Sequence, residues 1–304
     1  LGAYFNFRGD NRQEAYALKE LLTEEEYADA ELSRNSAYYT PEYIIDTLWD
    51  IAKKLGFRGG NIAENSAGIG NILAHMPSDI SERSNITATE PDAITSGILK
   101  YLYPDAVVHD TGYEKVNVEN GSVDLAITNV PFVSGMRVKD DVEKDLSKWE
   151  IHNFCIAKNI RKLAEGGLGI FMSTSATMDG AKELRRWIEN EGNADVIGLF
   201  RLNSETFGGA KVTSDIIVVR KRVNGEKSNL AIDVLDTEAV KEEMFEEEGK
   251  GGKLEEKKKV ICVNKYLAEH PENLGGEMDF AINHGDTRYG GTSVQCYPAE
   301  GKNQ

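Results

Sequence analysis

Residues Asn129, Val130, Pro131 and Phe132 combine an amide, a proline-stiffened turn and an aromatic ring, directly after the apolar run 123–128. The run predicts a buried strand, so the four residues would lie at its carboxyl end. There the amide and a backbone carbonyl can accept hydrogen bonds from a planar amino group, while the ring stacks on the heterocycle. Chemistry on a base amino group needs this equipment, because the base must be held outside its stack. The alternative is an ordinary Asn-x-Pro turn.

A second candidate group is the glycine-containing segment 64–71, which follows an apolar stretch and opens a predicted helix. Gly68 and Gly70 can adopt positive φ, and their missing Cβ lets a ligand lie against the backbone. Glu90 ends the next predicted strand, where its carboxylate can accept hydrogen bonds from both hydroxyls of a ribose. These residues indicate an adenosine-containing cofactor at the carboxyl ends of the strands. A tight turn beside a surface carboxylate is the alternative.

Two residues distinguish between possible cofactors. Leu73 stands where a dinucleotide-binding fingerprint has its third glycine. Glu64 precedes the glycines, and its carboxylate would repel a pyrophosphate but suits the ammonium of a methionine moiety. No Gly-Lys-Ser/Thr follows, which excludes a P-loop. The pattern therefore favours S-adenosylmethionine over NAD.

Short apolar runs alternate with helical stretches along the middle of the chain. The predicted strands are 60–64, 85–90, 106–109, 123–128, 168–173, 196–201 and 215–220, and the predicted helices are 70–75, 92–101, 149–164 and 181–190. Such alternation predicts an α/β fold with a Rossmann-like, doubly wound, mostly parallel sheet. The last two strands have no helix between them, which predicts an antiparallel hairpin at one sheet edge.

Two helical regions are expected before the first strand. Residues 11–33 carry an apolar face, and a capping box at 23–26 opens their second piece. A further helix follows Thr40 and Pro41 and ends at Gly56, with Thr40 as its expected cap. Past residue 223 we expect one more strand at 231–235, and the charged stretch 238–259 is expected to be a solvated linker or a frayed helix.

Composition narrows the class of protein. The 304 residues carry a net charge of −16, which opposes non-specific adhesion to nucleic acid. Neither a signal peptide nor an apolar run near the ~20 residues of a membrane span is evident, so no membrane association is expected. Three scattered cysteines and five histidines have no metal-ligand spacing, so no metal is expected and a reducing cytoplasm fits best.

The order of these motifs over residues 36–223 resembles the amino-group (N6-adenine) DNA methyltransferases of the gamma arrangement. That family includes type I modification subunits and the methylase regions of large phage or conjugative-element proteins. The segment 37–41 is similar to the family's first cofactor motif, 64–70 to its glycine motif and 90–92 to its ribose-binding acidic motif. The resemblance implies S-adenosylmethionine as cofactor, bound by Tyr39, Thr40, Glu64, Ser66, Gly68, Gly70, Glu90 and Tyr113.

The catalytic tetrapeptide of that family resembles Asn129-Val130-Pro131-Phe132, and the segment 202–215 resembles its second aromatic wall. The resemblance implies that Phe132 and Phe207 stack on a flipped adenine. Two residues depart from the pattern, because Asn65 and Val130 replace prolines. Valine keeps the backbone carbonyl that the family uses but loses the fixed φ of proline.

The resemblance implies a site-specific, adenine-specific DNA methyltransferase of a restriction-modification system or mobile element. We expect an N-terminal helical extension at 1–36, a catalytic domain at 37–225, and a charged linker with a short C-terminal extension at 226–304. No recognition domain is evident, so specificity is expected to reside in a separate subunit or in further parts of a larger polypeptide. The alternatives are a methyltransferase acting on ribosomal-RNA guanine or protein glutamine, and a non-catalytic cofactor-binding module of a helicase-like or anti-restriction protein.

Overall fold

The computed structural model describes residues 12–23, 40–207, 212–248, 254–282 and 292–298. The chain forms two compact units, Leu1–Phe171 and Met172–Gln304. Strand β5 begins in the first unit and ends in the second, so the main sheet belongs to both.

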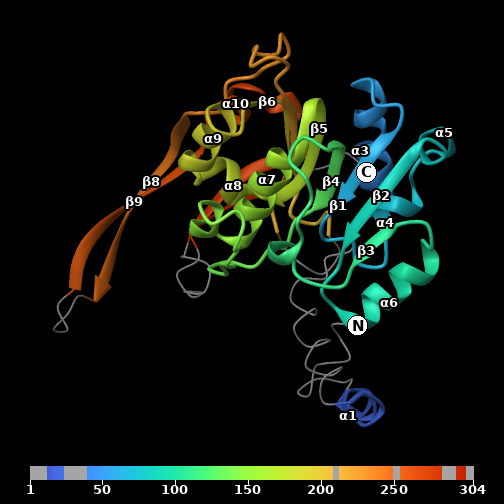
Figure 1. Cartoon of the computed structure of the whole chain (residues 1–304). Helices are drawn as coiled ribbons and strands as arrows, with labels where there is room; N and C mark the ends of the chain where they lie inside the picture. The colour runs from blue at the N-terminus through green and yellow to red at the C-terminus, as the bar shows by residue number, and fades with distance from the viewer. Residues whose placement is uncertain (1–11, 24–39, 208–211, 249–253, 283–291, 299–304) are drawn as a thin grey trace. The chain divides into compact units, whose positions relative to one another are not determined.

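The main sheet has seven strands in the order β3-β2-β1-β4-β5-β7-β6 (Figure 1). Its strands are β1 (Gly60–Glu64), β2 (Ser84–Thr89), β3 (Val107–His109), β4 (Val123–Asn129), β5 (Leu163–Thr174), β6 (Ala194–Leu202) and β7 (Ser214–Lys221). Strand β1 pairs in parallel with both β2 and β4, and β2 pairs in parallel with β3. Strands β6 and β7 pair antiparallel at one edge. The predicted doubly wound, mostly parallel fold with an edge hairpin is therefore confirmed.

Helices alternate with the strands of the first unit. They are α3 (Glu42–Lys54), α4 (Asn71–Ala74), α5 (Ser78–Ser81), α6 (Ala93–Leu102) and α7 (Ile151–Lys162), with 3₁₀ turns η2 (Tyr113–Lys115) and η3 (Leu146–Lys148). Helix α6 is capped by Asp92, whose carboxylate accepts from the amide of Thr95 at 2.7 Å. Each helix expected between residues 70 and 164 forms, with its ends within two residues of the expected ones.

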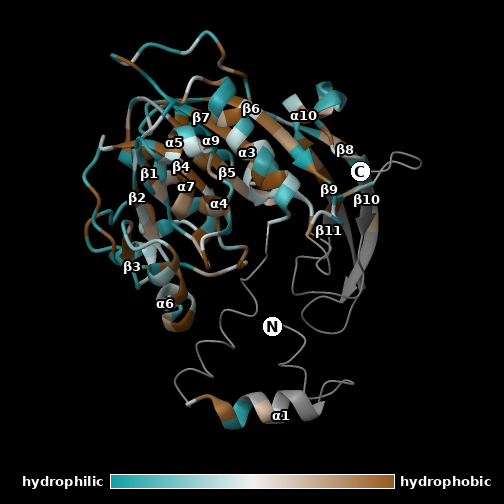
Figure 2. Cartoon of the chain, turned by 90° about the vertical axis from the view of Figure 1, so that its right-hand side faces the viewer, coloured by the Kyte–Doolittle hydropathy of each residue, from teal (hydrophilic) through white to brown (hydrophobic). Residues whose placement is uncertain are grey.

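The core of the first unit lies between the strands and these helices. Strand β4 is buried on both faces from Leu125 to Thr128, as a central parallel strand should be. Helix α7 buries ten of its twelve residues, so it runs through the unit rather than along its surface. Figure 2 shows many hydrophobic residues on the strands and packed helices, whereas the connecting loops carry both hydrophobic and hydrophilic residues.

Helix α3 begins one residue later than a Thr40 cap requires. Its N-cap is Pro41, and no side chain caps the helix. The expected capping role of Thr40 is therefore wrong, because its hydroxyl accepts a hydrogen bond from Asn129 instead. The end of α3 agrees with the sequence: Gly56 adopts φ 96° and its amide bonds to the carbonyl of Lys53.

The second unit is built on the end of β5, the β6–β7 hairpin and the short helices α8 (Ser175–Asp179), α9 (Lys182–Glu189) and α10 (Lys265–Glu269). Arg201 of β6 is fully buried in it. Its guanidinium donates two hydrogen bonds to Asp215 of β7, at 2.8 and 2.9 Å, and one to Asp179 of α8 at 2.9 Å. The buried charge is thus matched by bidentate pairing, which ties the hairpin to α8.

Two expectations for the C-terminal part of the chain are wrong. The charged stretch 238–259 is neither a linker nor a helix, because β8 (Thr237–Glu248) and β9 (Leu254–Asn264) pair in an antiparallel hairpin. Residues 231–235 form no strand, although Ile232 donates one backbone hydrogen bond to Val196 of β6. After α10 come the turn η4 (Pro271–Asn273) and a hairpin of β10 (Glu277–Ile282) with β11 (Thr292–Tyr297).

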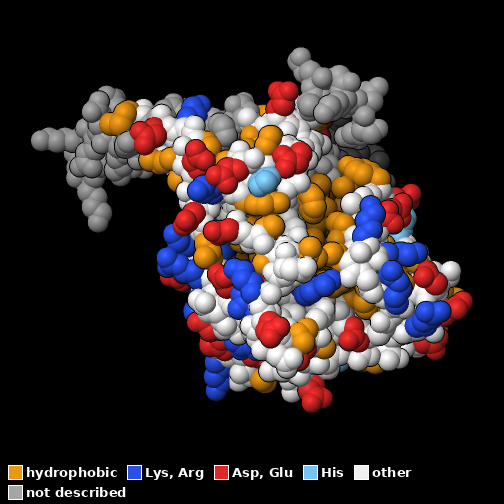
Figure 3. All heavy atoms as spheres, turned by 90° about the horizontal axis from the view of Figure 1, so that it is seen from above, with side chains coloured by type: hydrophobic (Ala, Val, Ile, Leu, Met, Phe, Trp, Pro, Cys, Tyr) orange, Lys and Arg blue, Asp and Glu red, His pale blue; other side chains and the backbone are white. Residues whose placement is uncertain are grey.

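Helix α1 (Arg12–Leu21) confirms helical structure in the first part of 11–33, whereas the expected capping box lies mostly outside the described residues. No described helix is long and apolar enough to cross a membrane. Within the same described ranges, no cluster of three or more His, Cys, Asp or Glu side chains is arranged to hold a metal ion. Acidic and basic side chains are interspersed on the face drawn in Figure 3.

Candidate active site

The register of the sheet brings three candidate segments to one edge of the first unit. Ala63 of β1 pairs with Ala126 of β4, and Glu64 pairs with Ala88 of β2. Parallel strands end at the same edge of a sheet. Glu64, Glu90 and Asn129 therefore emerge side by side at the carboxyl ends of three adjacent strands.

Asn129 is the last residue of β4 and is partly buried. Its Nδ2 donates a hydrogen bond of 3.2 Å to Oγ1 of Thr40, just ahead of α3. This contact fixes the amide plane and places its nitrogen on the Thr40 side. Val130 follows with only 2% exposure, while Pro131 and Phe132 are partly buried. Two motifs that are distant in the sequence, at residues 40 and 129, are thereby joined through one hydrogen bond.

Glu64 ends β1 as a buried carboxylate, 1% exposed. Burial raises its pKa well above the ordinary value, and the nearby charge of Glu90 raises the pKa further. Among the residues that the structure describes, Oε2 of Glu64 has no hydrogen-bond partner. A buried carboxylate oxygen without a donor is unfavourable, and a cationic ligand group would satisfy it.

The loop after Glu64 is shaped by two glycines in the left-handed region, Gly68 at φ 56° and Gly70 at φ 88°. A Cβ on Gly70 would lie 2.4 Å from the ring of Tyr103, so packing alone requires glycine there. A Cβ on Gly68 would meet no atom within 4 Å, so this glycine borders open space. Gly68, rather than Gly70, is therefore the position where a ligand can lie against the backbone. Ser66 donates its hydroxyl to the carbonyl of Asn65 at 2.8 Å.

Glu90 follows β2 and closes the other side of this loop. Its Oε2 accepts from the amide of Gly68 and its Oε1 from the amide of Asp92, both at 2.9 Å. Burial raises the pKa of Glu90, although these two amide hydrogen bonds act to lower it. A carboxylate oxygen can accept more than one hydrogen bond, so both oxygens keep capacity for ligand hydroxyls.

Tyr113 is more deeply buried than an adenine-stacking role suggests, with 6% exposure. Its ring meets Phe154 edge-on at 6.5 Å between centroids, and the ammonium of Lys158 lies 4.7 Å from its centroid. These contacts explain the ring as a core residue, and contact with the cofactor adenine stays a prediction.

Two further candidates belong to other parts of the chain. Tyr39 lies outside the described residues. Phe207 belongs to the second unit, where it is buried with 2% exposure. Its predicted role as a second aromatic wall stays a prediction.

Sequence reasoning missed three buried polar residues that support this edge: Asp140, Lys158 and Asn159, each at most 1% exposed. Lys158 of α7 donates to Asp140 and to the carbonyls of Tyr113 and Val116, at 2.7, 2.7 and 2.8 Å. For Lys158 and Asn159 the available signal was the presence of polar residues beside apolar ones in the predicted helix 149–164, whereas Asp140 lies before that stretch. That signal cannot reveal the partners, because they are distant in the sequence.

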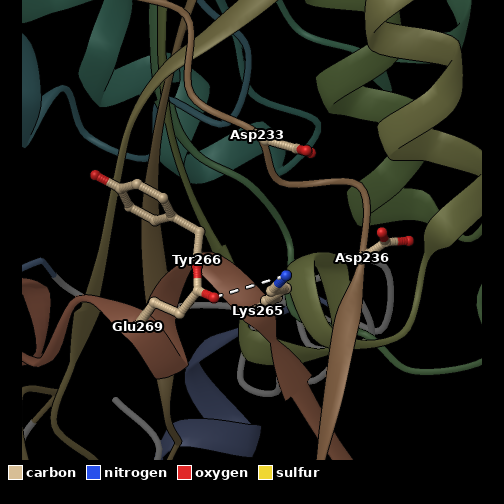
Figure 4. A pocket seen from close by; sticks show the side chains of 5 residues that line it. All are labelled: Asp233, Asp236, Lys265, Tyr266 and Glu269. Carbon is tan, nitrogen blue, oxygen red and sulfur yellow. Dashed lines mark ion pairs between the residues drawn. The ribbon is translucent and has the colours of Figure 1, made fainter.

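A surface pocket in the second unit is unrelated to these candidates. It is lined by Asp233, Asp236, Lys265, Tyr266 and Glu269 (Figure 4). Lys265 forms an ion pair with Glu269 at 3.6 Å and Lys182 pairs with Asp236 at 3.2 Å. The charges of this pocket are thus largely matched within the protein.

The strand order and the motifs at its carboxyl edge define a fold that solved structures share. A protein from Listeria monocytogenes, described as a class I S-adenosylmethionine-dependent methyltransferase, superposes with a TM-score of 0.51 at 17% identity, covering 62% of each chain. The chain thus has the fold of S-adenosylmethionine-dependent methyltransferases.

Modification subunits of type I restriction enzymes show the same fold. The subunit from Vibrio vulnificus YJ016 has a TM-score of 0.52 at 13% identity, covering 70% of this chain and 51% of that one. The methyltransferase subunit from Streptococcus thermophilus has a TM-score of 0.52 at 13% identity, covering 62% and 46%. The resemblance to modification subunits that the motifs indicated is therefore present in the fold as well.

In sequence, the chain is 26% identical over 190 residues to the "Defense against restriction protein B" of Escherichia phage P1. The match covers 61% of this chain but 8% of the phage protein, so the chain spans a small part of that relative's length. No protein-family model matches the chain.

Proposed function

We propose that this chain is the catalytic part of an S-adenosylmethionine-dependent DNA methyltransferase that methylates the N6 amino group of adenine. The observation that carries the proposal is the shared carboxyl edge of β1, β2 and β4, which holds Glu64, Glu90 and Asn129. A buried acid, a carboxylate and an amide at adjacent strand ends provide separate contacts for the two ends of a cofactor and for an amino group.

The residues at this edge fit S-adenosylmethionine. Glu64 would pair with the ammonium of the methionine moiety, since Oε2 has no donor within the described chain. Glu90 would accept the ribose hydroxyls, and the open side of Gly68 would lie against the cofactor. When bound, the cofactor supplies an electrophilic methyl group on a positively charged sulfur.

The chain's own contribution to the transfer is to prepare the adenine nitrogen. That nitrogen is a poor nucleophile because its lone pair is delocalised into the ring. The Asn129 side-chain oxygen and the Val130 carbonyl would each accept one N–H, which draws the nitrogen toward tetrahedral geometry. The lone pair of the nitrogen then points at the methyl group, in line with the bond from that methyl group to sulfur. Positioning and electrostatics are therefore the main sources of rate acceleration in this proposal.

An aromatic residue holds the base in this proposal. Phe132 follows the catalytic amide by three residues and would stack on the flipped adenine. Such a stack contributes about 1–3 kcal/mol, which offsets the few kcal/mol lost when a base leaves the duplex stack. Phe207 is proposed as the second wall.

Tritiated methyl transfer to unmethylated plasmid DNA tests the proposal. Asn129→Ala should lower the rate about 10²–10³-fold, as the loss of one transition-state hydrogen-bonding group does elsewhere. Asn85→Ala is the matched control, because Asn85 is exposed near the amino end of β2, where its side-chain amide donates to Asn61. Transfer that survives in Asn129→Ala contradicts the assignment.

The same assay separates the rival activities. Ribosomal RNA and a protein release factor, supplied in parallel with DNA, should remain unlabelled. Calorimetric binding of S-adenosylmethionine without transfer to any substrate would instead indicate a non-catalytic cofactor-binding module.

We further propose that this catalytic part works with a separate specificity subunit or within a larger polypeptide that counters restriction. The similarity to the phage P1 protein supports this setting, because the match covers only a small fraction of that protein. Sequencing of methylated sites on plasmid DNA tests it: the chain alone should modify adenines in many sequence contexts. Tight modification of one defined sequence contradicts it.

A further inference from the structure

The back of the glycine loop is joined to α7 by a pair of buried side-chain amides. Asn65, 4% exposed, donates from Nδ2 to Oδ1 of Asn159, which has no exposed surface. Nδ2 of Asn159 in turn donates to the carbonyl of Cys155, one helical turn earlier, at 2.9 Å. Asn159 therefore meets Asn65 with an amide whose orientation is already fixed by its own helix.

This amide pair also reaches the segment that carries Glu90. The hydroxyl of Thr89, itself fully buried, donates to Oδ1 of Asn65 at 3.4 Å. Asn65 directly follows Glu64 in the chain, and Thr89 directly precedes Glu90. One buried network thus connects the neighbours of both carboxylates of the candidate cofactor site.

Holding these carboxylates in place requires such a connection, because they repel each other. Glu64 is buried, so its charge is poorly screened by water. The amides of Gly68 and Asp92 hold the Glu90 carboxylate, and contacts of the neighbouring residues oppose the repulsion as well. At residue 65 the resemblance places a proline, which fixes the backbone directly. Here an asparagine stands instead, and its side chain is held at both ends.

We infer that Asn159 is a positioning residue for cofactor binding, acting through Asn65 and Thr89 to set the separation of Glu64 and Glu90. The inference rests on the proposed function, since it concerns the same cofactor. A buried polar pair such as Asn65 and Asn159 destabilises the fold unless both side chains are hydrogen-bonded. Two apolar side chains could fill the same space without that requirement. Unlike apolar side chains, the two amides form directional hydrogen bonds. These bonds fix the path of the glycine loop where it leaves β1.

Alanine variants measured by titration calorimetry with S-adenosylmethionine test the inference. Asn159→Ala should raise the Kd about tenfold, the factor expected when a buried amide loses its partner. The kcat at saturating cofactor should stay within about twofold of wild type, because Asn159 contacts no reacting group. Asn153→Ala is the matched control, since Asn153 is a buried asparagine of the same helix whose Oδ1 has no hydrogen-bond partner among the described residues. A wild-type Kd in Asn159→Ala overturns the inference.

The double variant Asn65→Ala/Asn159→Ala separates positioning from stability. Removing both partners leaves neither of these two amides unsatisfied, so the double variant should lose less stability than the sum of the two single variants while its Kd stays raised. Recovery of the wild-type Kd together with stability would overturn the inference, because the network would then be structural only.

Backbone amide hydrogen exchange tests the inference without any cofactor, so its result does not depend on the proposed function. The amides of Gly68 and Asp92, both bonded to Glu90, should exchange faster in Asn159→Ala than in wild type, whereas amides in β7 should not. Unchanged exchange at Gly68 and Asp92 overturns the inference even if the protein binds no S-adenosylmethionine. Failure of the wild-type protein to bind S-adenosylmethionine, with exchange changed as expected, contradicts the proposed function alone.

Discussion

Thr40 and Asn129 lie 89 positions apart in the sequence yet share a hydrogen bond, so the orientation of the amide proposed as catalytic depends on a hydroxyl. Thr40→Val removes the acceptor and should lower kcat by up to about tenfold, the range for one lost hydrogen bond. Thr40→Ser keeps the hydroxyl and should stay near wild type. Neither change should shift the melting temperature much, because Pro41 rather than Thr40 is the N-cap of α3. Equal activity of the two variants would contradict the role of the hydroxyl.

If Glu64 binds the cofactor as proposed, it should make that binding depend on pH. Its pKa is raised first by burial and then by Glu90, so it takes up a proton at a higher pH than an ordinary carboxyl. Affinity for S-adenosylmethionine should fall as the pH is lowered through that raised pKa, since a neutral acid pairs poorly with an ammonium. Glu64→Gln should weaken binding at neutral pH at least about tenfold and flatten the profile. Calorimetry across pH, with exposed Glu82→Gln as control, measures both.

Glu64 should also make the free energy of unfolding depend on pH, in the direction opposite to its effect on cofactor binding. A carboxyl whose folded pKa is raised binds its proton more tightly in the folded state than in the unfolded state. Ligand-free protein therefore loses stability as the pH rises from about the ordinary value of 4.5 through the raised pKa. Glu64→Gln should melt at a higher temperature than wild type at neutral pH while binding the cofactor less well. A lower melting temperature would contradict the assigned burial effect.

The sequence predicted the conformation and position of individual residues correctly where these depend on the local sequence. Gly68 and Gly70 both adopt positive φ, and Glu64 and Asn129 lie at strand ends as expected. It failed at Thr40, because a threonine before Pro-Glu satisfies the local pattern of a helix cap equally well. Only the tertiary fold brings the hydroxyl to Asn129 instead.

At the scale of elements, Lys158 joins α7 to Asp140, in the loop between β4 and η3. Its ion pair with Asp140 is 1% exposed on both sides. Lys158→Met should therefore lower the free energy of unfolding by about 3–5 kcal/mol, because Asp140 is left as an unpaired buried charge. The double variant with Asp140→Leu should recover most of that loss. Urea unfolding measures both values, and Lys100→Met, which breaks an exposed pair with Asp110, should change them by less than about 1 kcal/mol.

Sequence periodicity predicted the elements of the sheet but not those of residues 237–264. In the sheet, buried apolar runs such as 123–128 identify strands without knowledge of their partners. In β8 and β9, runs of Glu and Lys carry no apolar alternation, so composition suggested a linker. Their pairing is a cross-strand property of the backbone, for example Glu242 opposite Val260, which a single segment cannot reveal.

The whole molecule carries a charge of −16, and acidic and basic side chains alternate over the face in Figure 3. Non-specific DNA binding depends on phosphate neutralisation by basic groups. The chain alone should therefore bind duplex DNA weakly, with a Kd above about 10⁻⁴ M at physiological salt. Fluorescence anisotropy with a labelled duplex measures this. Micromolar binding by the isolated chain would contradict the expectation that DNA affinity comes from a partner or from further parts of a larger polypeptide.

One measurement tests the central proposal most directly: mass spectrometry of nucleosides from DNA treated with the chain and methyl-deuterated S-adenosylmethionine. Wild type should produce N6-deuteromethyladenine, and Asn129→Ala should produce about 10²–10³-fold less, with Asn85→Ala unchanged. Label on cytosine, or equal label on adenine in wild type and Asn129→Ala, would contradict the proposal that the amide at the end of β4 activates the adenine amino group.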